Sequence, residues 1–109
     1  AMNELTAEKI SELAADRRNI HLTLHVLNRF KERGIVFEDV QNVLLHGEII
    51  EQYPNDYPFP SCLELGATIY GKALHVCCGV GDNKIWLITA YYPSEDEWES
   101  DLKTRKVVK

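Results

Sequence analysis

The chain has 109 residues, of which 45% are hydrophobic and 27% charged, and its formal net charge at pH 7 is −5. This composition excludes an intrinsically disordered chain, and the lack of an apolar run of about 18 residues excludes a membrane-spanning helix. We therefore expect one cytoplasmic domain over residues 2–109, with a helical part at about 4–47, a sheet part at about 48–93 and a C-terminal segment at 94–109.

The first part of the chain has the spacing of amphipathic helices. A first helix is predicted over residues 5 to about 18, with Thr6 as its start signal. A second helix is predicted over 24–33, between Thr23 as the N-cap and Gly34 as the stop. These two helices are expected to pack their apolar sides on the strands predicted later in the chain.

A third helix and then a run of strands are predicted next. In FEDVQNVLLHG the helical spacing turns Val40, Val43 and Leu44 inward, and Gly47 ends the helix. Runs rich in β-branched and aromatic residues follow at 48–53, 61–70, 73–80 and 85–92. The predicted fold class is α+β, with two to three N-terminal helices packed on one face of a four-stranded, mainly antiparallel sheet and a short C-terminal helix or turn.

The last two strands form a hairpin whose register follows from its turn. With Asp82–Asn83 at the centre, Val80 lies opposite Ile85 and His75 lies opposite Ala90. The apolar face, which needs helices to cover it, then carries Leu74, Val76, Cys78, Val80, Ile85 and Leu87. The other face is the candidate binding surface and carries His75, Cys77, Trp86, Ile88, Ala90 and Tyr92.

The second predicted helix is basic in an otherwise acidic chain. His25, Arg29 and Arg33 are spaced four residues apart, so they form a row that drifts from solvent towards the core boundary. Such a row fits an anionic ligand or an acidic partner. It equally fits a solvated helix surface on which the arginines pair with Glu48 or Glu51.

Neither a disulfide framework nor a metal or other cofactor is predicted. The cysteines are odd in number, and Cys77 and Cys78 are strand neighbours that point to opposite faces. A zinc site lacks a Cys-x-x-Cys pair, and His21 lies outside the helix that would pair it with His25. No P-loop, dinucleotide-binding or Gly-x-Ser-x-Gly motif is present.

Residues spread along most of the chain resemble a known family. The shared features are His25, Arg29, Arg33-Gly34, Gly47-Glu48, Tyr53-Pro54, Pro58, Pro60, Gly66, His75, the TAYYP run and Trp98. In these the chain is similar to the bacterial family named domain of unknown function 4258, which implies no established activity. Helices followed by a curved antiparallel sheet also resemble the RelE-like and barnase-like ribonuclease toxins, at the level of the fold.

Under the ribonuclease hypothesis, the residues divide into proton-transfer and substrate-binding groups. His25 and His75 are the candidate catalytic acid and base, because imidazole titrates near neutral pH. Arg33 is the candidate catalytic cation at the phosphate. The candidate substrate-binding residues are Arg29, Tyr57, Trp86 and Tyr92. The expected partners are then RNA and a cognate antitoxin.

Two other functions fit the same residues. A non-catalytic protein-binding module would use the basic helix and the aromatic sheet face, and its acidic stretch at 95–101 would dock on a basic protein. An enzyme for a small anionic metabolite would use the arginines as a clamp. Every one of these hypotheses requires the second helix and the middle of the sheet to meet around one open hollow.

Overall fold

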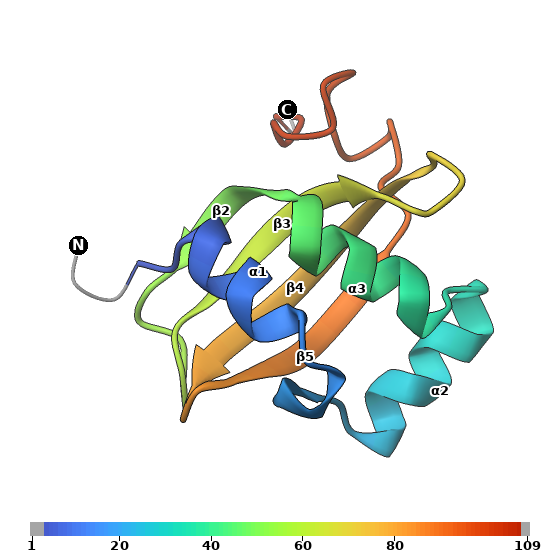
Figure 1. Cartoon of the computed structure of the whole chain (residues 1–109). Helices are drawn as coiled ribbons and strands as arrows, with labels where there is room; N and C mark the ends of the chain where they lie inside the picture. The colour runs from blue at the N-terminus through green and yellow to red at the C-terminus, as the bar shows by residue number, and fades with distance from the viewer. Residues whose placement is uncertain (1–3, 108–109) are drawn as a thin grey trace.

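The computed structural model describes residues 4–107 and contains three helices packed on a five-stranded sheet (Figure 1). The helices are α1 (Ala7–Ala14), α2 (Leu24–Arg33) and α3 (Phe37–His46), and a 3-10 turn follows α1 at Arg17–Asn19. The strands are β1 (Ile20–His21), β2 (Glu48–Tyr53), β3 (Ser61–Ala67), β4 (Ala73–Gly81) and β5 (Lys84–Tyr91). The predicted α+β class is confirmed.

The helix boundaries follow local capping signals. The hydroxyls of Thr6 and Thr23 accept hydrogen bonds from the backbone three residues on, at 3.1 Å and 3.2 Å. Gly34 ends α2 with a left-handed φ of 68°. The first helix is shorter than predicted, because Asp16 caps a separate 3-10 turn instead of continuing the helix.

The sheet has one more strand than the sequence predicted. Its order is β1-β5-β4-β3-β2, and all neighbours are antiparallel except β1, which runs parallel to β5. The prediction of four strands was wrong because the connector at Ile20–His21 pairs with Ile85 and Trp86, far along the chain. This pairing brings His21 onto the sheet.

The predicted hairpin register is correct at the turn and wrong farther from it. Asp82 and Asn83 have φ values of 56° and 58°, and Val80 pairs with Ile85. A bulge in β5 then shifts the pairing, so that His75 lies opposite Tyr91 and not Ala90. Ala90 and Tyr92, which were predicted on the open face, consequently pack with the core on the helix side.

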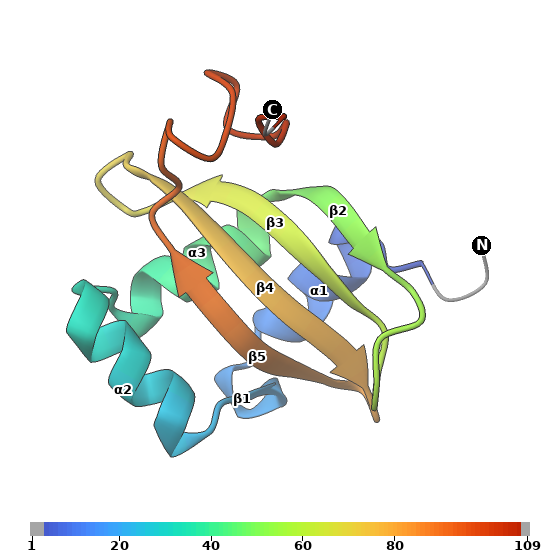
Figure 2. The same ribbon diagram turned by 180° about the vertical axis from the view of Figure 1, so that it is seen from behind.

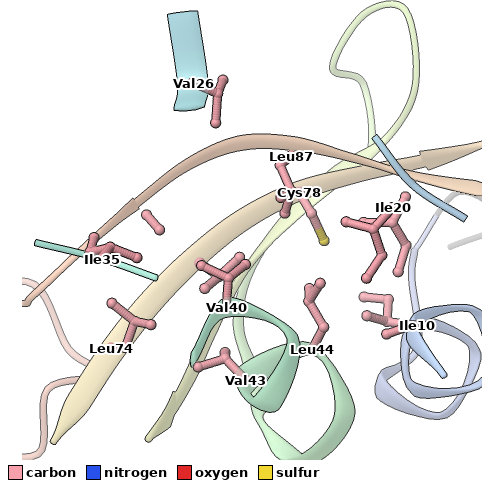
Figure 3. Close-up of a cluster of buried hydrophobic side chains, with 14 of the residues drawn as sticks. Ile10, Ile20, Val26, Ile35, Val40, Val43, Leu44, Leu74, Cys78 and Leu87 are labelled. Carbon is pink, nitrogen blue, oxygen red and sulfur yellow. The ribbon is translucent and has the colours of Figure 1, made fainter. Parts of the chain in front are cut away.

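The helices cover one face of the sheet and leave the other face open over much of its area. In Figures 1 and 2, α1 and α3 lie across one side, whereas α2 lies beyond the β5 edge. The core between helices and sheet is drawn in Figure 3. Its buried members include Ile10, Phe30, Val40, Val43, Leu44, Leu74, Val76, Cys78 and Ile85. The predicted inward residues of the third helix are therefore confirmed.

Residues 93–107, here called the C-terminal strap, leave β5 and fold over one end of the open face. They contain no helix, so the helical alternative for this segment was wrong; Trp98 and Arg105 form a single antiparallel bridge. The Trp98 side chain is buried, with 2% of its surface exposed. The strap thus divides the open face into a covered end and an uncovered end.

Candidate functional site

The uncovered end of the open face holds a groove of about 710 Å³. Its walls come from β1 and the residues after it, from the β2–β3 loop, and from β4 and β5, which Figure 2 shows from this side. The lining residues are His21, Leu22, Thr23, Asp56, Tyr57, Pro58, Phe59, Gly79, Asp82, Trp86, Leu87 and Ile88. Two residues predicted to bind substrate, Tyr57 and Trp86, therefore lie in one groove.

Three rings form a stacked array in this groove, with Trp86 in the middle. The His21 ring centroid lies 4.8 Å from that of Trp86, and the Phe59 centroid lies 5.8 Å from it, with interplanar angles of 25° and 24°. The Trp86 indole donates a hydrogen bond to the Gly81 carbonyl at 3.1 Å, which fixes the ring orientation. Since 37% of Trp86 is exposed, the array presents aromatic surface to a ligand.

Glycine in β4 makes room for this array. A Cβ atom at Gly81 would clash directly with the Phe59 ring, so the ring can lie flat across the strand only because no side chain stands there. The Val80 amide donates to the Pro60 carbonyl at 3.1 Å and holds the loop against the strand. The loop and the strand therefore form one rigid wall.

Asp56 organises the exposed rim of the loop. Its carboxylate accepts hydrogen bonds from the Tyr57 backbone amide at 3.0 Å and from the Ser61 hydroxyl at 2.7 Å. The Tyr57 ring is 91% exposed and stands at the mouth of the groove. An exposed aromatic ring on an ordered loop is available to a partner at little cost in ordering.

A second hollow of about 460 Å³ shares Asp56 and Ile88 with the first and continues it along the sheet. Cys77 lies in its lining, and burial raises the pKa of the Cys77 thiol to about 11. The thiol is therefore protonated at neutral pH and is a poor nucleophile. The two hollows are therefore neighbours on the open face, on either side of Asp56 and Ile88.

Fixed charge in the groove is negative. Asp56 and Asp82 contribute carboxylates to the lining of the two hollows, and neither lining contains a lysine or arginine. A negative rim over an aromatic floor favours cationic ligands and disfavours phosphates.

A family model described as domain of unknown function (DUF4258) matches residues 22–92. The chain belongs to the DUF4258 family. No curated protein and no solved structure matches it, and the likeness to RelE-like toxins stays a hypothesis. The DUF4258 match contains α2, α3 and β2 to β5, and it ends where the strap begins.

His75 of the DUF4258 domain has no exposed surface. Its Nδ1 lies 3.3 Å from the Tyr91 hydroxyl and its Nε2 lies 2.7 Å from the Leu102 carbonyl, while Trp98 packs edge-on at 4.6 Å between centroids. Burial lowers the pKa of His75, partly offset by the hydrogen bond to Leu102. In this arrangement the imidazole is neutral at pH 7 and out of reach of a substrate.

The basic row on α2 does not converge with His75. His25 is exposed on the first turn of α2, and Arg29 pairs with Glu32 at 3.6 Å. Arg33 is bound to β5 through the Thr89 hydroxyl at 3.1 Å and the Ala90 carbonyl at 2.8 Å. Glu48 and Glu51, which were considered as mates for the arginines, pair with Lys103 and Arg105 instead.

Arg33 is expected to act as an anchor for α2. Replacement of Arg33 by alanine should lower the free energy of unfolding by about 1 kcal/mol, because two hydrogen bonds to β5 are lost at a partly exposed site. Amide exchange in α2 should accelerate at the same time. Arg29→Ala is the matched control and should leave both quantities unchanged, because its ion pair is exposed; equal effects of the two variants would contradict the anchor role.

Tyr92 lies on the helix side of the sheet and not in the groove. Its hydroxyl donates to the Gly34 carbonyl at 3.3 Å, and the Lys72 ammonium lies 3.9 Å from its ring centroid. The prediction that Tyr92 shares a face with His75 was wrong, because the β5 bulge reverses the alternation beyond Ile88. Tyr92 therefore contacts the end of α2 through Gly34 and the β3–β4 turn through Lys72.

Two rings of the array, His21 and Phe59, and the two rim carboxylates, Asp56 and Asp82, were not predicted as site residues from the sequence. The turn-rich loop pointed to rigidity but not to the contact of Phe59 with Trp86, and the short β1 carries no strand signal of its own.

Within residues 4–107, no group of three His, Cys, Asp or Glu side chains is placed to hold a metal ion. In the same range, none of the helices has the length and apolar character needed to cross a membrane.

Proposed function

We propose that this DUF4258 protein is a non-catalytic protein-binding module whose open sheet face takes an extended, positively charged segment of a partner. The observation that carries the proposal is the His21, Trp86 and Phe59 array, which lies in a groove whose acidic rim holds Asp56 and Asp82. Aromatic residues are enriched at protein interfaces, where they supply large contact area at low entropic cost.

An arginine side chain matches both features of the groove. The guanidinium group is planar, stacks on aromatic faces and pairs with carboxylates. The chain carries a net charge of −5, which attracts a basic partner at long range and speeds encounter. Two neighbouring hollows that share Asp56 and Ile88 in their linings offer room for successive side chains of an extended segment.

RNA cleavage, the other hypothesis raised by the sequence, finds less support in the geometry. In the form predicted from the sequence, it needs His25, His75 and Arg33 around one phosphate, as acid, base and cation. His75 is covered by Trp98, and Arg33 is bonded to β5. The groove itself would set phosphates against Asp56 and Asp82.

Trp86→Ala should weaken peptide binding at least ten-fold. The probe is a nine-residue peptide of alternating arginine and serine with one central leucine, and its affinity is measured by calorimetry. The loss follows from removal of the central ring of the array, which contacts both His21 and Phe59. Ile69→Ala removes an exposed apolar side chain that does not line either hollow and is the matched control, with no expected effect.

The contribution of the acidic rim to peptide binding is tested separately with Asp82→Asn. Asparagine tolerates the positive φ of this turn position, so the fold is kept while one rim charge is removed. Binding should weaken and depend less on salt. The proposal fails if the arginine peptide does not bind, or if it binds no better than the same peptide with glutamate in place of arginine. Cleavage of single-stranded RNA by the purified chain would also overturn it.

A further inference from the structure

The C-terminal strap is attached to the rest of the molecule through side chains and not through backbone pairing. Its backbone hydrogen bonds close within the strap, as from the Glu99 amide to the Thr104 carbonyl at 2.8 Å and from Lys106 to Glu97 at 2.9 Å. Across the described range 4–107, no backbone-to-backbone bond joins it to a helix or to the sheet. Side chains and the His75 to Leu102 bond hold it in place. The strap can therefore lift away without breaking the sheet ladder.

Two cationic side chains of the strap bind carboxylates on the edge strand β2. Arg105 makes a bidentate contact with Glu51, Nε to Oε2 at 2.8 Å and Nη2 to Oε1 at 3.0 Å. Lys103 lies 2.8 Å from Glu48. The Arg105 guanidinium holds the pKa of the Glu51 carboxyl below its usual value, and Tyr53 also donates to Glu51. The sheet thus presents a preformed site for a guanidinium group.

The guanidinium is also stacked on an aromatic ring. The Arg105 Cζ atom lies 4.7 Å from the Trp98 ring centroid. The same Trp98 ring also packs edge-on against His75. The Arg105 and Glu51 side chains keep 60% and 22% of their surface exposed, so solvent and other cations reach the pair. The bidentate geometry makes this a strong contact, and its solvent-accessible side lets an arginine of a partner compete for the same carboxylate.

We propose that the strap is an internal ligand of the open face, which occupies a second arginine-binding site formed by Glu51, Tyr53 and Glu48 and is displaced by an arginine of the partner segment. This inference rests on the proposed function, because it extends the partner's path from the Trp86 groove to the other end of the same face. The DUF4258 match spans residues 22–92, so Glu48, Glu51 and Tyr53 lie within it, and the strap follows it in the chain. Displacement of the strap removes Leu102 and Trp98 from His75.

Release of the strap is tested in the full chain with Trp86→Phe, which leaves Trp98 as the one tryptophan and a clean reporter. Adding Lys103→Ala and Arg105→Ala should shift Trp98 emission to longer wavelength and raise its acrylamide quenching several-fold. Cooperative melting of the sheet, followed by circular dichroism, should persist. If the double variant does not fold, Lys103→Gln alone, which removes one exposed pair, should give a smaller shift in the same direction.

Competition is tested with a labelled, acetylated and amidated peptide that copies residues 102–106. It should bind the double variant at least ten-fold more tightly than the chain with an intact strap, and a copy with glutamine in place of its arginine should not bind. Glu51→Gln should abolish this binding, whereas Trp86→Ala should not. The two proposals can therefore fail separately. If the groove proposal is wrong, Trp86→Ala will not weaken binding of the nine-residue peptide. If the strap proposal is wrong, Glu51→Gln will not weaken binding of the 102–106 peptide. Unchanged Trp98 emission in the double variant, or equal peptide affinity with and without the strap's cations, would overturn the proposal.

Discussion

Replacement of Glu64 by glutamine should stabilise the protein at pH 7 and remove most of the decline in its stability between pH 5 and 8. Glu64 lies on β3 with no exposed surface, and neither carboxylate oxygen has a hydrogen-bond partner. Burial raises the pKa of the Glu64 carboxyl from 4.5 to about 8. The side chain is on the helix side of the sheet, two residues from the core residue Cys62.

The sign follows from the two pKa values of Glu64. Below pH 4.5 both the folded and the unfolded chain hold the proton, so the carboxyl costs no ionisation energy. Above pH 4.5 the unfolded chain releases the proton and the folded chain retains it, so stability falls until the pH passes about 8. The full difference corresponds to roughly 5 kcal/mol, of which roughly 3 kcal/mol applies at pH 7.

Urea unfolding of wild type and Glu64→Gln from pH 4 to pH 9 measures this effect. The amide also lacks partners in the core and costs about 1 to 2 kcal/mol at every pH, so we expect a net gain of about 1 to 2 kcal/mol at pH 7 and a net loss of similar size below pH 4.5. Glu12→Gln, at an exposed position on α1, is the control and should change nothing. The same pH slope in wild type and Glu64→Gln would show that the buried carboxyl is not its source.

Local signals predicted the local structure well. The caps Thr6 and Thr23, the stop at Gly34 and the Asp82–Asn83 turn depend on side-chain and backbone chemistry within a few residues, and the structure confirms each of them. The inward face of α3 follows in the same way from its spacing. These features need no knowledge of the tertiary fold.

Features that depend on distant pairing were missed. The two-residue β1 exists because Ile20 and His21 meet Ile85 and Trp86, and no pattern in a two-residue strand reveals this. The extra residue Ile88 in β5 looks like ordinary alternation in the sequence, yet it reverses the faces beyond it. Errors of this kind displaced Ala90 and Tyr92 from their predicted face.

The candidate site was predicted in part for the same reason. Tyr57 and Trp86 were recognised as aromatic side chains on a rigid loop and on the strand face that stays open, and both line the groove. His75 was placed on the correct face by alternation. Its burial depends on Trp98, which reaches it from a segment without regular structure. Sequence alternation assigns a face to a residue but does not show what lies over that face.

Gly47→Ala should destabilise the protein by about 3 kcal/mol, near the upper end of the usual cost of overpacking. Gly47 ends α3, as predicted, but with φ of −77° and ψ of 175°, which any residue can adopt. Its importance is steric: a Cβ atom there would lie 2.6 Å from the Val43 carbonyl oxygen and 2.9 Å from that of Leu65. Both are backbone atoms, so α3 and β3 would have to move apart.

Gly34 provides the matched comparison, because its requirement for glycine comes from backbone conformation, whereas that of Gly47 comes from lack of space. Its φ is 68° and a Cβ atom there would meet nothing within 4 Å, so Gly34→Ala should cost only about 1 kcal/mol of backbone strain. Asparagine tolerates the left-handed region, so Gly34→Asn should recover most of that loss, whereas Gly47→Asn should be at least as damaging as Gly47→Ala. Thermal and urea unfolding of the four variants separates the two causes. Recovery by asparagine at Gly47 would show that backbone conformation, not the approach of α3 to β3, sets the requirement for glycine there.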